Sequence, residues 1–341
     1  MTTSRFGSRT GRAAAALALC ALAFSGNAPA EEAAAPAAPQ QIGVIRSGIP
    51  HDAIYEMAIE GATGYAVGAF GVILESKDGG TSWAATSSPT NLALLGIAML
   101  GDKRIIVGQR GTVLLGKEGG GWEAAKSGTE SRLMGISVNS KGVALSVGEF
   151  GTIILSHDGG KSWSPIELDW EKFAEGGYQP HMYIARVEES GRLTVGGEFG
   201  LVLVSEDDGK TWTSKHKSDE SLFAMHVLED GTGFGVGQKG LVIKTVDNGN
   251  TWEKVDVGGD ANLLGVWVSK QGEVVIAGIR ALIRSSDAGA TWTHSGDPQV
   301  LRNWYQAIGI GEAKVKTEAG PVHAQVVYIG GARGMIAQVL R

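Results

Sequence analysis

Five aspartates of this chain stand in one local pattern, Ser/Thr-x-Asp-x-Gly-x-Ser/Thr-Trp, which we call the Asp–Trp box. A carboxylate between hydroxyls could ligate calcium, but calcium takes about six to eight oxygen ligands and each box offers one carboxylate. In a turn, by contrast, the Asp oxygens accept backbone N–H groups and the Gly supplies a positive φ. We therefore expect structural boxes, without a metal or a cofactor. Their Asp and Trp residues are Asp78, Trp83, Asp158, Trp163, Asp207, Trp212, Asp247, Trp252, Asp287 and Trp292.

Cations gather in a second pattern, the turn that follows the second aliphatic run of each repeat, which is Gly-x-x-Gly in six copies and Gly-x-x-Ala in one. The variable pair contains a cation in copies two, five, six and seven, and a Glu followed by a Phe in copies three and four. Cations on one face could bind the carboxylates of an acidic partner. The alternative is that these cations are ordinary solvent-exposed residues without a partner, because exposed turns favour polar residues. With two arginines from the adjoining connections, the candidate partner-binding residues are Arg110, Lys239, Arg280, Arg333, Arg132 and Arg302.

Residue sets that would support catalysis are missing from these patterns. A sialidase needs three arginines, a tyrosine nucleophile with a glutamate partner, and an acidic acid/base residue. Its usual Arg-Ile-Pro sequence is missing from Ile45–Pro50. The seven histidines lack metal-binding spacing, and Gly119–Gly121 lacks the Lys-Ser/Thr of a phosphate loop. We expect no catalytic residue and no enzyme activity.

The elements that position these residues follow from the repeat itself. The box tryptophans, with a shorter sixth copy at Gly116–Trp122, recur at about 40 residues, which is typical of a repeat architecture. In the third repeat, four aliphatic runs at 133–138, 143–151, 152–156 and 164–166 alternate with Gly, Asp and Ser. This pattern predicts a four-stranded antiparallel meander. Because such a sheet cannot bury both faces alone, we expect the units to pack radially as blades.

The number of blades follows from the mismatch between the two motifs. Seven Gly turns accompany only six boxes, and the last turn, Gly331–Gly334, is followed by a single strand. An orphan strand begins at Ile42, before the first full repeat. We therefore predict an all-β, seven-bladed β-propeller of four-stranded antiparallel blades over residues 42–341, closed by the N-terminal strand that completes the last blade. Closure also removes the free sheet edges.

Two insertions interrupt the period, at 169–181 and at 309–323. Long loops on a rigid scaffold often have a function. Trp170, Phe173 and Tyr178 in the first insertion suit a protein interface. They could equally fold back onto their own blade.

The first 30 residues are typical of a secretory signal peptide, with Arg5, Arg9 and Arg12 before an apolar run and Ala28-Pro29-Ala30 as the cleavage site. Residues 31–41 read as a flexible Ala/Pro leader. We expect an exported, periplasmic or lumen-side monomer without a membrane span. Without the signal arginines, acidic residues outnumber basic ones by 36 to 27, which argues against nucleic-acid binding.

Repeats of the form Val-Gly-x-x-Gly-x-Ile/Val-Leu followed by Ser-x-Asp-Gly-Gly-x-Ser-Trp resemble the Asp-box (BNR) propellers. Among these the chain looks most like the photosystem II stability/assembly factor family, over residues 42–341. The resemblance implies a non-catalytic propeller that holds a membrane-protein subunit or complex. Its partner is therefore expected to be a membrane-associated protein. The alternative is a secreted Asp-box glycosidase, similar to sialidases, or a carbohydrate-binding protein.

Overall fold

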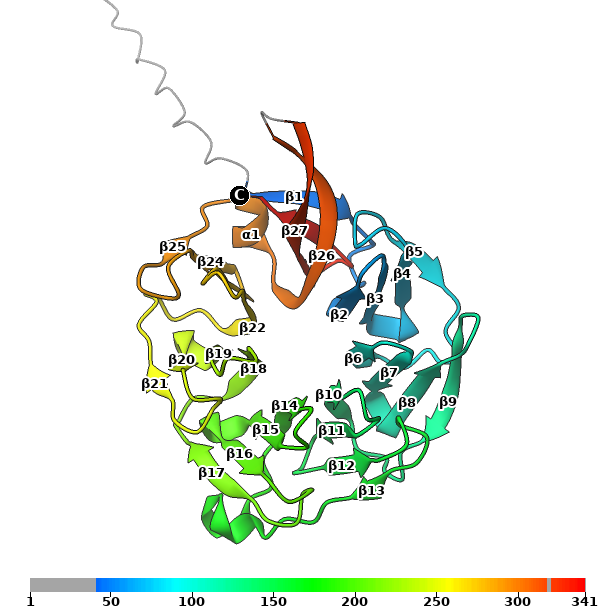
Figure 1. Cartoon of the computed structure of the whole chain (residues 1–341), viewed down its shortest axis with the longest axis vertical. Helices are drawn as coiled ribbons and strands as arrows, with labels where there is room; N and C mark the ends of the chain where they lie inside the picture. Colours follow the sequence, from blue (N-terminus) through cyan, green and yellow to red (C-terminus); the bar gives the residue numbers. More distant parts are fainter. Residues whose placement is uncertain (1–40, 318–319, 341) are drawn as a thin grey trace, which may run out of the picture. The chain divides into compact units, whose positions relative to one another are not determined.

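The computed structural model describes residues 41–317 and 320–340, and these form seven four-stranded antiparallel sheets arranged as blades around a central axis (Figure 1). In the first six blades the strands follow chain order from the axis outward. The predicted fold is therefore confirmed. The expected signal peptide at 1–30 and all but the last residue of the leader at 31–41 lie outside the described residues.

The first three blades are β2 (Ile54–Glu60) to β5 (Ala84–Thr86), β6 (Leu94–Leu100) to β9 (Trp122–Lys126), and β10 (Leu133–Val138) to β13 (Ser164–Pro165). Their middle strands are β3 (Thr63–Gly68), β4 (Ile73–Ser76), β7 (Lys103–Gly108), β8 (Thr112–Gly116), β11 (Ala144–Gly148) and β12 (Ile153–Ser156). Blades four to six begin at β14 (Met182–Val187), β18 (Leu222–Val227) and β22 (Leu263–Val268). They continue with β15 (Leu193–Gly197), β16 (Val202–Ser205), β17 (Thr213–His216), β19 (Gly233–Gly237), β20 (Val242–Thr245), β21 (Glu253–Lys254), β23 (Val274–Gly278), β24 (Ala281–Ser285) and β25 (Thr293–His294).

The core lies between neighbouring blades. Each full box tryptophan lies next to the start of its outer strand and packs against the preceding blade. Trp163, for example, packs with Ile105 and Leu115 of blade two, and its indole N–H donates to the Gly160 carbonyl at 2.9 Å. The boxes therefore connect the blades through apolar burial, the main favourable term in folding.

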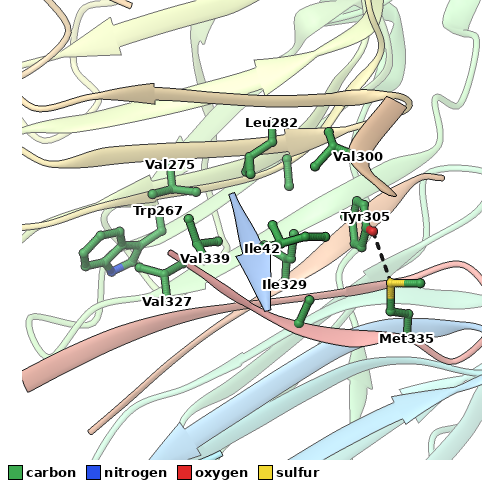
Figure 2. Close-up of a cluster of buried hydrophobic side chains, with 12 residues drawn as sticks. Ile42, Trp267, Val275, Leu282, Val300, Tyr305, Val327, Ile329, Met335 and Val339 are labelled. Carbon is green, nitrogen blue, oxygen red and sulfur yellow. Dashed lines mark hydrogen bonds between the residues drawn. The ribbon is translucent and has the colours of Figure 1, made fainter. Parts of the chain in front are cut away.

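The seventh blade combines both ends of the folded chain, in the order β1 (Ile42–Arg46), β28 (Ile336–Val339), β27 (Gly320–Gly331) and β26 (Tyr305–Thr317). Ile42 is fully buried in the cluster between blades six and seven, beside Val339 and Ile329 (Figure 2). In the same cluster the Tyr305 hydroxyl donates to the Met335 sulfur at 3.1 Å. The N-terminal strand thus closes the ring, as the sequence predicted.

Two departures from the plain repeat occur near this closure. Helix α1 (Pro298–Arg302) lies in the connection from blade six to blade seven. The insertion at 309–323, expected as a loop, instead lengthens the two inner strands of blade seven into a hairpin that projects from the ring (Figure 1).

Candidate functional site

The seven Gly turns and the blade-linking segments share one face of the ring, which we call the turn face. Gly111 N–H donates to the Ser131 carbonyl, which joins a turn to the following link, at 2.8 Å. The boxes lie on the opposite face, where Gly159 N–H donates to Gly142 in the turn between the first and second strands. The Gly turns and the Asp–Trp boxes therefore lie on opposite faces of the ring.

The second variable residue of every Gly turn has a left-handed backbone, with φ between 51° and 59°. L-residues other than Gly and Asn are disfavoured there, at a cost of about 1–2 kcal/mol. Neither Gly nor Asn occupies any of the seven positions, and all seven side chains are exposed. They are Phe70, Arg110, Phe150, Phe199, Lys239, Arg280 and Arg333. The chain thus places cations and aromatic rings in solvent against the preference of the backbone.

The first variable residue has a different role, which the sequence pattern did not reveal. Gln109 Oε1 accepts the N–H of Ala93 at 3.1 Å, and Glu149 Oε1 accepts the N–H of Arg132 at 2.9 Å. Glu198 accepts the N–H of His181 at 2.9 Å in the same way. In these three turns the first variable side chain therefore fixes the link to the turn, and the second variable residue is the one free to contact a partner.

The six candidate cations are all exposed on the turn face. Lys239, Arg280 and Arg333 belong to consecutive blades, and Arg302 ends α1 beside them, because Arg280 N–H donates to the Asn303 carbonyl at 2.9 Å. Arg110 has one distant, exposed ion pair, 3.9 Å from Glu130. Across residues 41–317 and 320–340 the other five cations form no ion pair.

An aromatic sector lies opposite, on blades three and four. Phe150 is 62% exposed and packs edge-on against His181, whereas Tyr178, 47% exposed, packs edge-on against Phe199. Of the three aromatics in the 169–181 insertion, Trp170 is buried against its own blade and Phe173 packs beside it. Tyr178 is the most exposed of the three.

The exposed cations of blades five to seven form a cationic sector. A cavity of about 710 Å³ lies on the central axis, between this sector and the aromatic one. In each innermost strand the pairing register skips one residue, and all seven skipped side chains line this cavity. We call them the collar: Tyr55, Leu95, Met134, Tyr183, Phe223, Leu264 and Gln306. The sequence interpretation missed the collar, because its signal is only an apolar or aromatic residue at the second position of six inner strands, with Gln306 at that position in the seventh.

The boxes on the opposite face have the expected turn geometry. Asp158 accepts the Ser156 hydroxyl, the Ser162 N–H and the Ser162 hydroxyl at 2.8, 2.9 and 2.6 Å. The bonds from Ser162 are the main reason that its pKa falls to about 2. Among the described residues, no group of three or more His, Cys, Asp or Glu side chains could hold a metal ion.

The BNR/Asp-box repeat family matches residues 154–165. Two similar solved structures are YCF48 bound to D1 peptide (TM-score 0.67, 20% identity, 89% of this chain and 96% of that chain) and YCF48 from Cyanidioschyzon merolae (TM-score 0.66, 16% identity, 88% and 98%). A third is the GH74 xyloglucanase from Xanthomonas campestris (TM-score 0.64, 16% identity, 88% and 53%). A comparison with curated proteins finds no match. These findings confirm the expected Asp-box repeat and the shared propeller fold.

Within the described ranges, no helix has the length and apolar character needed to cross a membrane.

Proposed function

We propose that this chain is an exported, non-catalytic scaffold that binds an acidic segment of a membrane-associated protein on its turn face. The observation that supports this function best is the set of exposed cations held at left-handed positions on that face. Carboxylates are the natural partners of such a set, because charge-assisted hydrogen bonds from Arg and Lys are among the strongest in proteins.

The structural similarity to YCF48 supports the same proposal. One of the similar propellers has a D1 peptide bound. By analogy, the partner of this chain is a membrane-protein subunit or complex, and binding involves the cationic sector together with the exposed rings of Phe150 and Phe199.

The test replaces Arg110, Lys239, Arg280 and Arg333 jointly with Gln. The immobilised mature protein captures membrane proteins from detergent extracts of the producing organism, and mass spectrometry identifies them. We expect the wild type to enrich a defined membrane protein, and the variant to bind it at least about tenfold more weakly. Binding to the wild type should also weaken with added salt.

A matched control removes the same charge from the box face, by replacing Lys77, Lys117, Lys161 and Lys210 with Gln. This control should capture the partner as well as the wild type does. Equal capture by the turn-face variant, with its fold intact by circular dichroism, would refute the proposed surface. Hydrolysis of sialosides or xyloglucan by the wild type would contradict the non-catalytic assignment.

A further inference from the structure

One acidic side chain interrupts the layer directly below the collar. The residue after each collar residue is small or apolar in six blades, and in the first blade it is Glu56. A Cβ atom at Gly135 would lie 2.4 Å from the Tyr183 carbonyl oxygen, and one at Gly265 would lie 2.3 Å from that of Gln306. The packing of neighbouring blades leaves no room for a side chain at these two positions, and the layer holds no other polar side chain, so Glu56 is an exception to the repeat.

Glu56 lines both the 710 Å³ cavity and an adjoining cavity of about 220 Å³. Its Oε1 accepts the Met57 N–H at 3.0 Å. In the part of the chain that the structure describes, no Lys, Arg or His nitrogen lies within 4 Å of this carboxylate. A half-buried carboxylate without a counter-charge is costly, so its presence in the cavity calls for a ligand that supplies the charge.

We propose that the central cavity binds a primary ammonium group on an aliphatic stem, with Glu56 as its counter-ion and the collar as the wall for the stem. Because Oε1 of Glu56 already accepts the Met57 N–H, Oε2 is the oxygen left for a ligand. An ammonium is a compact charge that can bind to one oxygen, whereas a guanidinium binds best to two free carboxylate oxygens. The rings of Tyr55, Tyr183 and Phe223 attract a cation as well. The cavity volume lies in the range of about 300–1,000 Å³ that is usual for small-ligand sites.

The charge of Glu56 changes near neutral pH. Burial raises its pKa to about 7, and the Met57 N–H opposes this shift. Because only the ionised form is a counter-ion, affinity for an ammonium should rise as the pH passes upward through about 7. Other titratable or charged side chains on the surrounding strands and across the cavity are Tyr55, Glu60, Tyr65, Tyr305, Glu312, Tyr328, Arg132, Glu149, His181 and Tyr183.

The experiment is a titration of the mature protein with n-pentylammonium, followed by calorimetry and by changes in the NMR signals of the collar residues. We expect saturable binding at pH 8.5, at least about tenfold weaker at pH 5.5, and no binding of the neutral isostere 1-pentanol. Shortening the stem should weaken binding by about fourfold per methylene. The ammonium group could come from a lysine side chain of a protein or from a free amine. Titration with a lysyl peptide and with its Nε-acetylated form distinguishes these two sources.

Glu56→Gln, which keeps the shape of the side chain, should weaken n-pentylammonium binding at pH 8.5 by at least about tenfold and remove its pH dependence. Glu118→Gln, at an exposed site on the box face, should leave binding unchanged. Equal affinity of the Glu56→Gln variant, with an unchanged melting temperature, would overturn the proposal. Absence of saturable binding to the wild type would overturn it as well.

Discussion

At the scale of single residues, the box aspartates couple the stability of the ring to pH. The pKa values of Asp158, Asp207, Asp247 and Asp287 are lowered to about 2, mainly by the N–H and hydroxyl of the Ser or Thr four residues later. Since the unfolded value is about 3.9, this stabilisation is fully present above pH 4 and is lost as the pH falls through about 2. Urea midpoints measured between pH 5 and pH 2 should decrease steadily over that window.

Asp158→Asn gives the matched test at one box. The variant should melt about 1–3 °C below the wild type at pH 7, because it loses the charge-assisted bonds from Ser162. The difference should shrink at pH 2, where the wild-type carboxyl is largely protonated. A difference that stays constant across this range would contradict the proposed origin of the pH dependence.

At the scale of elements, Asp297 fastens the closing strand to the rest of the ring. Its carboxylate is buried and accepts three backbone N–H groups, those of Gln41 and Ile42 at 2.7 and 3.2 Å and that of Gln299 in α1 at 2.8 Å. Asp297→Ala would remove the side-chain acceptor of these three N–H groups, so we expect a loss of about 1–3 kcal/mol in the free energy of unfolding. Hydrogen exchange at Ile42 should accelerate.

Asp297→Asn retains one side-chain oxygen acceptor, so its loss of stability should be smaller. Unchanged exchange at Ile42 in Asp297→Ala would show that apolar burial and pairing with β28 hold the strand without Asp297.

The elements also show how far the sequence could predict this molecule. The blades, their number and the closing strand were predictable, because they depend on local turn chemistry and on a periodic apolar pattern. The contacts of Asp297 with Gln41 and Ile42 were not, since these two partners lie about 255 residues away in the chain. The left-handed backbone at Lys239 could not be predicted for another reason. A lysine normally has a negative φ, so its residue type gives no sign of this conformation. Local rules therefore predict the scaffold, but not the features that distinguish one blade from another.

At the scale of the whole molecule, the propeller depends on one short strand to close the ring. β1 covers the edge of β28 and buries Ile42 completely. A chain beginning at Ser47 would lose this burial, worth about 1.5–3 kcal/mol for the isoleucine alone, and would expose a free sheet edge that can pair with other molecules. We therefore expect a lower melting temperature than for a chain beginning at Gln41, with concentration-dependent association in analytical ultracentrifugation.

A synthetic peptide of residues 41–47 completes this test. Added in excess to the chain that begins at Ser47, it should restore the melting temperature in part and suppress association, because it can pair again with β28 in the register that joins Ile42 to Val339. A peptide with Ile42 replaced by Asp places a charge in the closed cluster and should have no effect. If the shortened chain stays monomeric and melts like the longer one, the ring holds together without β1.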